Sequence, residues 1–333
     1  MSSAFVFEDE TLLCQQTVSG WSPVLVDLPA FSTDHKPQPA YQLGRVQLQT
    51  SLAPSYWQSA DPTTADSIVM EHGAPATSAI TYYYAQNHQL ALPKITPLSS
   101  VGEVAAHANK NTALDANDSD SDSDSAITAF IPYRQLLARL SVALADQLSQ
   151  AIQLLRWQAD TQFCSRCSAP VKVATSGERA MVCSVCRLRQ YPRVQPCVIT
   201  AITRLNPVTN EMQVLLAHHH RYGQTTPSLQ YGLIAGFVEV GESLEHAVVR
   251  EVAEEVGIRV TDIRYVSSQP WPFPSNLMLG FRASYVGGDI VIQEDELSHA
   301  EFFDISNLPK IPFKGSIAYD LIAQIAQEQG VCL

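Results

Sequence analysis

Six glutamates and one arginine lie close together between Gly236 and Ile258, in GFVEVGESLEHAVVREVAEEVGI. On a helix, Glu251, Glu254 and Glu255 stand at positions i, i+3 and i+4, so their carboxylates would project from one face. Like charges at this spacing destabilise a helix by roughly a few tenths of a kcal/mol each. Mg²⁺ and Mn²⁺ prefer oxygen ligands and bridge carboxylates to substrate phosphates. The spacing therefore indicates a divalent-metal site that acts on phosphates.

Three further residues, Gly236, Gly257 and Arg250, would position these carboxylates. Gly236 would permit a tight loop turn, and Gly257 fits the C-cap of the helix. Arg250 is placed to pair with a loop carboxylate such as Glu242. An exposed charged helix with solvated glutamates is the alternative interpretation. It would explain the glutamates, but it does not require Gly, Glu, Arg and Gly in one register.

A second chemical motif consists of four cysteines, Cys164, Cys167, Cys183 and Cys186, in the pattern C-x₂-C-x₁₅-C-x₂-C. Two CxxC pairs at this separation place four thiolates around one Zn²⁺ in a short β-ribbon. A pair of disulfides is the alternative, which a reducing compartment disfavours. We expect a structural zinc, because four protein thiolates leave no open position for water.

Three consecutive histidines, His218 to His220, follow a strand-like run and precede RYGQTTPS. They suggest either a metal site or a polar loop. We expect a polar loop, because no second ligand cluster is recognisable nearby in the sequence. Cys14, Cys197 and Cys332 lack partner spacing, and Cys197 is most simply a small core residue.

At 333 residues the chain exceeds the usual size of one core, so two or three domains are expected. Short apolar runs near the start predict a β-rich domain over residues 1–125, which ends in an acidic Ser/Asp segment, 115–125, interpreted as a disordered spacer. Leucines at helical spacing predict a connecting amphipathic helix over 126–160. Its apolar stripe is interpreted as a packing or dimer surface rather than a cofactor site. A zinc ribbon over 161–190 and an α/β domain over 191–333 complete an α+β multidomain chain.

The formal net charge of −12 argues against general nucleic-acid binding, although five of the negative charges come from the Ser/Asp segment. The ribbon region is basic, with Arg166, Lys172, Arg179, Arg187, Arg189 and Arg193 accompanied only by Glu178. This patch would either guide an RNA chain or form an ordinary charged surface. No apolar run approaches the roughly 18 residues that a membrane span requires, and the start MSSAFVFEDE lacks the features of a signal peptide, so a cytoplasmic protein is expected.

The glutamate-rich stretch matches the Nudix box, G-x₅-E-x₇-R-E-U-x-E-E-x-G-U with U aliphatic, at every defined position. SQPWPFPSNLM (268–278), the cysteine ribbon and YPRVQP (191–196) further resemble the NADH pyrophosphatase (NudC-type) branch of the Nudix hydrolases. The resemblance is specific from about Trp157 to the end of the chain. It implies an α/β/α sandwich, a homodimer, and metal-dependent hydrolysis of NADH or NAD⁺ to NMNH or NMN and AMP. Action on NAD-capped RNA is also implied.

The resemblance also implies the site residues. Catalytic roles fall on Arg250, Glu251, Glu254 and Glu255. Ligands of two or three Mg²⁺ or Mn²⁺ ions would be Glu251, Glu255, Glu296 and the Ala235 carbonyl. Substrate contacts are implied at Glu178, Tyr191, Phe237, Gln269, Pro270, Trp271, Pro272, Phe273, Pro274, Ser275, Asn276 and Ala318. Either Glu254 or Glu255 would orient or deprotonate the attacking water.

Trp271 and Phe273, stiffened by flanking prolines, would form an aromatic wall for nicotinamide or adenine, with ordinary core packing as the alternative. The chain departs from the branch at His299, Phe302 and Ser168, which affects the far wall of the pocket rather than the box. A broader dinucleotide or ADP-ribose pyrophosphatase is the competing enzyme hypothesis. A non-catalytic nucleotide sensor is another, but that hypothesis predicts eroded carboxylates in the box.

Overall fold

The computed structural model describes residues 3–8, 10–27, 83–86, 127–140, 142–175, 178–222 and 229–333. The chain divides into two compact units, with a boundary in the sequence between Pro192 and Arg193, and each unit is described by itself. The predicted acidic segment 115–125 lies outside the described residues. Within the ranges described, no helix combines the length and apolar character that crossing a membrane requires.

The first unit begins with a six-stranded sheet of β1 (Ser3–Glu8), β2 (Thr11–Thr17), β3 (Gly20–Pro23), β4 (Leu25–Asp27), β5 (Tyr83–Gln86) and β6 (Thr128–Pro132). The strand order is β3-β2-β1-β4, with β5 paired to β1 and β6 paired to β2. Phe7, Leu12 and Phe130 are fully buried. The predicted β-rich N-terminal region is therefore confirmed.

The predicted continuous helix over 126–160 is wrong at its N-terminal end. Residues Thr128–Pro132 form strand β6 instead, because they pair with β2 far away in the sequence. A short helix α2 (Tyr133–Leu136) and a 3₁₀ turn η4 (Leu137–Arg139) follow, and an extended Leu140 separates them from α3 (Val142–Asp160). In α3, Leu148 and Ile152 are buried within this unit, which supports the packing role of the stripe.

The cysteine region forms a small three-stranded sheet in the order β7-β8-β9. Its strands are β7 (Val171–Val173), β8 (Met181–Cys183) and β9 (Arg189–Gln190). Both neighbouring pairs are antiparallel. Such a small ribbon buries little apolar surface, so it needs a cross-link or a metal to hold it.

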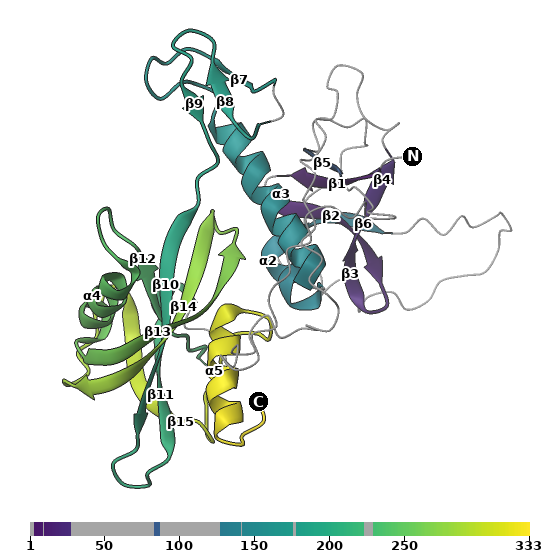
Figure 1. The fold of residues 1–333 in the computed structure, drawn as a ribbon. Helices are drawn as coiled ribbons and strands as arrows, with labels where there is room; N and C mark the ends of the chain where they lie inside the picture. Colours follow the sequence, from purple (N-terminus) through teal and green to yellow (C-terminus); the bar gives the residue numbers. More distant parts are fainter. Residues whose placement is uncertain are drawn as a thin grey trace, which may run out of the picture. The chain divides into compact units, whose positions relative to one another are not determined.

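The second unit contains a six-stranded sheet in the order β13-β14-β10-β11-β15, with β12 paired to β10. Its strands are β10 (Gln195–Leu205), β11 (Met212–His219), β12 (Ile234–Phe237), β13 (Arg259–Trp271), β14 (Asn276–Gly287) and β15 (Leu297–Asp304). A 3₁₀ turn, η5 (His220–Tyr222), follows β11. Helices α4 (Leu244–Val256) and α5 (Ile317–Glu328) cover the two faces of this sheet (Figure 1).

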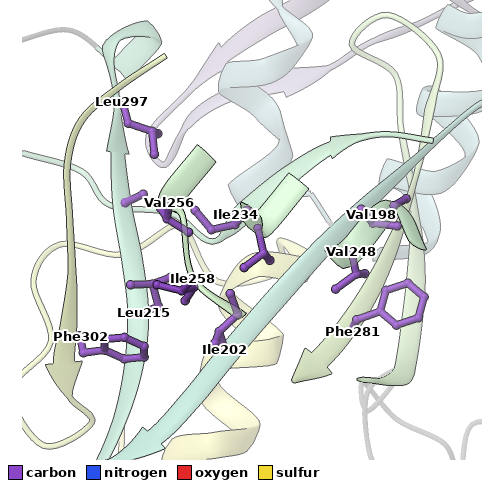
Figure 2. Close-up of a cluster of buried hydrophobic side chains, with 13 residues drawn as sticks. Val198, Ile202, Leu215, Ile234, Val248, Val256, Ile258, Phe281, Leu297 and Phe302 are labelled. Atoms are coloured by element: carbon purple, nitrogen blue, oxygen red, sulfur yellow. The ribbon is translucent and has the colours of Figure 1, made fainter. Parts of the chain in front are cut away.

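Alternation along the central strands explains the two covered faces. Val198 and Ile202 of β10 join the cluster that buries Val248 of α4, as Figure 2 shows. Ile199 and Ala201 of the same strand join a second cluster that contains the apolar face of α5. Successive strand residues point to opposite faces, so one strand feeds both cores. The expected α/β/α sandwich is thereby confirmed.

The apolar run DIVI, Asp289 to Ile292, is not a strand, because its backbone groups are used elsewhere. The N–H groups of Val291 and Gln293 donate to the carbonyl oxygens of Val256 and Glu255, at 3.1 and 2.9 Å. These carbonyls belong to the last turn of α4 and have no partner within the helix. The segment therefore ties the end of α4 to the chain that leads to Glu296.

Candidate metal and nucleotide site

Helix α4 carries the glutamates on a well-capped segment. The Ser243 hydroxyl accepts a hydrogen bond from the His246 N–H at 3.3 Å, which satisfies one free donor of the first turn. Gly257 ends the helix in the left-handed conformation, with φ of 71°. The predicted C-cap is thus confirmed. Both caps fix the register in which the carboxylates leave the helix.

Arg250 joins the helix to the preceding loop. Its Nε and Nη2 donate to the two carboxylate oxygens of Glu242, at 2.8 and 2.9 Å, so the expected pair is present. Nη1 donates to Glu251 at 2.8 Å and to Glu254 at 2.9 Å. Nη2 also donates to the Phe237 carbonyl at 2.8 Å. The hydrogen bonds from Arg250 lower the pKa of Glu242 to about 2.

Gly236 has a different role from the predicted loop turn. It lies within strand β12, and its φ is not positive. A Cβ at this position would lie 2.0 Å from Cδ and 2.1 Å from both carboxylate oxygens of Glu251. Glycine is required here because the Glu251 carboxylate approaches the backbone of β12.

Glu255 is the most deeply buried carboxylate of the box, with 2% of its surface exposed. Burial, together with the negative charges of Glu251 and Glu296, raises the pKa of Glu255 to about 8. Arg221 and a backbone hydrogen bond with Ala235 oppose this rise. Its Oε2 is buried without a hydrogen-bond partner among the described residues. An acceptor-only group in this position fits a cation better than water.

Donor atoms of Glu255, Glu296 and His219 lie within 4.8 Å of one another, so the structure brings two of the predicted metal ligands together. Glu251 lies outside this close group, although its charge acts on Glu255. The predicted ligand Ala235 lies on β12 and contacts Glu255 through its backbone. Glu254 is exposed and paired with Arg250. The oxygen-rich donor set fits a hard divalent cation.

The polar-loop interpretation of His218 and His219 is wrong. Both residues lie on β11 and are buried, with 1% and 3% exposed. The pairing of β11 with β15 shifts register between them, which indicates a β-bulge. A bulge breaks the strict alternation of a strand, so both neighbours can face the interior. Only His220 leaves the strand, in η5.

The motif SQPWPFPSN forms the end of the β13–β14 hairpin. Trp271 pairs with Asn276, and Pro272 to Ser275 make the connecting turn. The Trp271 ring contacts Phe273 edge to face at 5.3 Å between centroids, and stacks with Phe313 at 6.4 Å and 25°. Phe313 was missed because a single aromatic in a loop gives no spacing signal. The aromatic wall therefore has three rings.

Several predicted substrate residues also have structural roles. Gln269 donates to the Gly315 carbonyl and accepts from the Ile317 N–H, each at 2.9 Å, so its amide fixes the start of α5. Asn276 is buried and donates to the Phe273 carbonyl across the turn at 3.3 Å. Ala318 is 8% exposed within the α5 core cluster. Phe237, in contrast, is 49% exposed beside the box.

Two predicted substrate residues lie in the first unit and contact each other. The Tyr191 hydroxyl donates to Glu178 at 2.7 Å, and Arg189 forms an ion pair with the same carboxylate. The hydrogen bond to Glu178 raises the pKa of Tyr191. Tyr191 is 51% exposed, so one face of the ring is accessible. This group forms a polar and aromatic surface next to the ribbon.

The four ribbon cysteines gather as the spacing predicts. Their Sγ atoms lie within 4.8 Å of one another, with 3.5 Å between Cys164 and Cys186 and between Cys167 and Cys183. All seven cysteines of the chain are free thiols. The backbone N–H groups of Val185 and Cys186 donate to the Cys183 sulfur. Although burial raises it, these hydrogen bonds lower the pKa of Cys183 to about 6. The cluster is compatible with a zinc site.

Comparison with known proteins follows the same division of the chain. The model of the NUDIX domain matches residues 200–324. A protein of Pseudomonas syringae called NAD-capped RNA hydrolase NudC is 44% identical over 199 residues, which cover 59% of this chain and 67% of that protein. The chain belongs to the NudC-type Nudix family. Nudix hydrolases depend on metals, in agreement with the buried carboxylates.

A second curated relative of this Nudix chain gives the same assignment. NAD-capped RNA hydrolase NudC of Klebsiella pneumoniae is 47% identical over 175 residues, covering 52% of this chain and 63% of that protein. The chain spans about 63% to 66% of the length of several curated relatives that it matches. The crystal structure of a NUDIX hydrolase from Nitrosomonas europaea is 24% identical, with a TM-score of 0.41, and covers 51% of this chain and 94% of that one.

Proposed function

We propose that the chain hydrolyses the pyrophosphate bond of NADH and NAD⁺, giving AMP and NMNH or NMN. The observation that carries this proposal is the buried Glu255 carboxylate close to the exposed Glu296, beside a Nudix box in which every defined position is filled. A desolvated carboxylate next to further negative charge is costly without a cation. Relatives called NAD-capped RNA hydrolase NudC support the choice of an NAD-type substrate.

We assign different roles to the carboxylates of the metal site according to how deeply each is buried. Glu255, Glu296 and Glu251, with the Ala235 carbonyl, are proposed to hold Mg²⁺ or Mn²⁺. The bound ions supply charge neutralisation for the pyrophosphate and activation of water. Glu254 is exposed and 2.9 Å from Arg250, which leaves its carboxylate accessible to a water molecule. We therefore assign the orientation or deprotonation of the attacking water to Glu254 rather than to Glu255.

The binding of the dinucleotide is assigned to the hairpin and its neighbours. Trp271 and Phe273 present an aromatic pair at the hairpin turn, with Phe313 stacked behind Trp271. A flat base ring gains stacking energy on such a surface. Gln269 positions the start of α5, where Ala318 lies, while Pro270, Pro272, Pro274, Ser275 and Asn276 shape the turn. Phe237, Glu178 and Tyr191 complete the proposed substrate contacts.

Removal of NAD caps from RNA is the second proposed activity. It is favoured by the basic residues of the ribbon region, since clustered Lys and Arg attract the phosphate backbone. Arg189 is paired with Glu178, and Arg166, Lys172 and Arg187 add positive charge to the ribbon region. The ribbon itself is proposed to hold one structural Zn²⁺ through Cys164, Cys167, Cys183 and Cys186.

The remaining parts of the proposal concern the whole chain. We propose a β-rich N-terminal domain that extends to Pro132 of β6, a helical segment up to 160, a zinc ribbon over 161–190 and a Nudix domain over 191–333. A cytoplasmic location is proposed, because a four-thiolate zinc cluster requires reduced cysteines, which a reducing compartment maintains. A homodimer is proposed from the family resemblance. The apolar stripe of the 126–160 segment is partly buried within the single chain, which limits the apolar surface left for a partner subunit.

A substrate panel tests this function. Zinc-loaded protein would be incubated with Mg²⁺ or Mn²⁺ and NADH, NAD⁺, ADP-ribose or a short NAD-capped RNA, and products separated by chromatography. AMP and NMNH should dominate, with kcat/KM for NADH at least about tenfold above that for ADP-ribose, or roughly 1.4 kcal/mol. A preference for ADP-ribose would support the broader pyrophosphatase. Binding without turnover on any substrate would support the nucleotide sensor.

A further inference from the structure

The buried histidine on β11 lies beside the carboxylates of the metal site. His219 Nε2 is 3.9 Å from Glu255 Oε2, and both side chains are nearly inaccessible, with 3% and 2% exposed. A separation of 3.9 Å is too long for a hydrogen bond. Two ligands about 2.1 Å from one ion lie about 3.0 Å apart at a right angle and about 4.2 Å apart in opposition. The observed distance falls between these limits.

Glu296, the third residue of this group, is held by His220, which follows His219 at the end of β11. The His220 N–H donates to the Glu296 carbonyl at 3.0 Å, and its ring Nε2 lies 3.0 Å from the Glu294 carbonyl. From the other side, Gln293 donates to the Glu255 carbonyl at 2.9 Å. These backbone hydrogen bonds fix the segments that carry Glu255 and Glu296, and the side-chain donor atoms of His219, Glu255 and Glu296 lie within 4.8 Å of one another.

The chemistry of the imidazole fits coordination of a cation. An imidazole nitrogen is a common metal ligand, and the His219 ring is buried with its donor atom close to those of Glu255 and Glu296. Glu255 Oε2 provides an independent sign, since it is buried and lacks a hydrogen-bond partner in the described part of the chain.

We propose that His219 is a nitrogen ligand of the catalytic metal site, alongside Glu255 and Glu296. This proposal rests on the metal-dependent function given above. An imidazole nitrogen suits Mn²⁺ and later transition ions, whereas Mg²⁺ strongly prefers oxygen. The mixed donor set therefore selects Mn²⁺ or a related transition ion over Mg²⁺ at this position. The family resemblance assigns only oxygen ligands to the site.

Electron paramagnetic resonance of Mn²⁺ bound to the full, zinc-loaded chain tests this assignment. Spin-echo modulation should show a directly coordinated ¹⁴N in the wild type, and its pattern should change to that of ¹⁵N when histidine is isotopically labelled. His219→Gln should remove the nitrogen signal and weaken Mn²⁺ binding at least about tenfold, while Mg²⁺ binding changes much less. His299→Gln, an exposed histidine on β15, is the matched control and should retain the signal.

Absence of histidine nitrogen modulation in the wild type would overturn the proposal, and so would its persistence in folded His219→Gln. Equal weakening of Mn²⁺ and Mg²⁺ binding would assign His219 a purely structural role and would also overturn it. If His219→Gln does not fold, the wild-type labelling experiment still decides. Neither result depends on turnover. Failure to hydrolyse NADH with the nitrogen signal intact would contradict the proposed function and leave the ligand assignment standing.

Discussion

The Glu251 carboxylate lies against the backbone of Gly236. A Cβ added to Gly236 would lie only 2.0 Å from the Glu251 Cδ, which is too close for any side chain. A carboxylate of α4 therefore reaches into β12 only because this strand residue has no side chain. Arg250 donates to the same carboxylate at 2.8 Å, which fixes it from the helix side. The glycine of the Nudix box thus serves close approach, and not a turn.

Gly236→Ala should displace Glu251 and leave most of the fold intact. A shift of about 1 Å at a catalytic group can cost about 10²-fold in rate, so kcat/KM for NADH should fall by about that factor. Gly287→Ala is the control, since that glycine also has no positive φ and an added Cβ would meet only the Arg259 guanidinium, at 3.2 Å. Activity of Gly236→Ala within about twofold of wild type would contradict the close-approach role.

Arg250→Lys should reduce turnover although the charge is kept. A lysine ammonium cannot reproduce the two parallel bonds to Glu242 together with those to Glu251, Glu254 and the Phe237 carbonyl. We expect kcat to fall at least about tenfold, because the loop and the carboxylates lose their register. Steady-state kinetics on the folded variant measures this loss. Arg264→Lys, on the exposed part of β13, should leave kcat unchanged; equal losses in both variants would refute the account.

Metal binding should tighten as pH rises. The pKa of Glu255 is raised from 4.5 to about 8, so between these values the folded protein retains a proton that the unfolded chain releases. This group therefore contributes less stability to the metal-free protein as pH increases. A cation must displace the proton, so affinity should rise by up to about tenfold per pH unit between roughly pH 6 and pH 8.

Thermal unfolding with and without Mn²⁺ measures this linkage. The stabilisation produced by Mn²⁺ should be larger at about pH 8 than at about pH 6, and Glu255→Gln should remove most of the difference. The control Glu245→Gln changes an exposed glutamate in the first turn of the same helix. A Mn²⁺ effect that does not vary with pH would show that Glu255 is already ionised in the folded protein.

Removal of zinc should destabilise the ribbon selectively. The small sheet β7-β8-β9 has few apolar contacts of its own, so its free energy of folding depends on the thiolate cluster. Cys183→Ser should lower zinc content from about one ion per chain towards zero and lower the ribbon's Tm by at least about 5 °C. Cys332→Ser, an exposed and isolated thiol, should keep the zinc. Full zinc content in Cys183→Ser would exclude the four-thiolate site.

Local features of the sequence predicted the helix that carries the carboxylates. The Gly257 cap and the pairing of Arg250 with Glu242 involve residues close together in the chain, so spacing alone determines them. The cysteine cluster follows for the same reason. Pairing between segments distant in sequence determined the elements that local spacing does not predict. Residues 128–132 form a strand because β2 is available, which no local periodicity reveals.

The position of His219 shows the same limit inside the site. Its neighbours predict a strand followed by a polar turn, whereas a bulge in the pairing of β11 with β15 turns it towards Glu255. Likewise, Phe313 reaches Trp271 only through the packing of the chain before α5. A register shift and a long-range ring contact depend on partners distant in sequence, so they emerge only in the folded structure.

Metal-dependent turnover of NADH by Glu255→Gln, beside wild type and Glu245→Gln, tests the central claim most directly. With saturating Mg²⁺ or Mn²⁺, wild type and Glu245→Gln should release AMP and NMNH, whereas Glu255→Gln should lose at least about 10²-fold in kcat. Circular dichroism and zinc content should match among the three proteins. If folded Glu255→Gln retained most of its turnover at saturating metal, the carboxylate cluster around Glu255 would not be the catalytic centre.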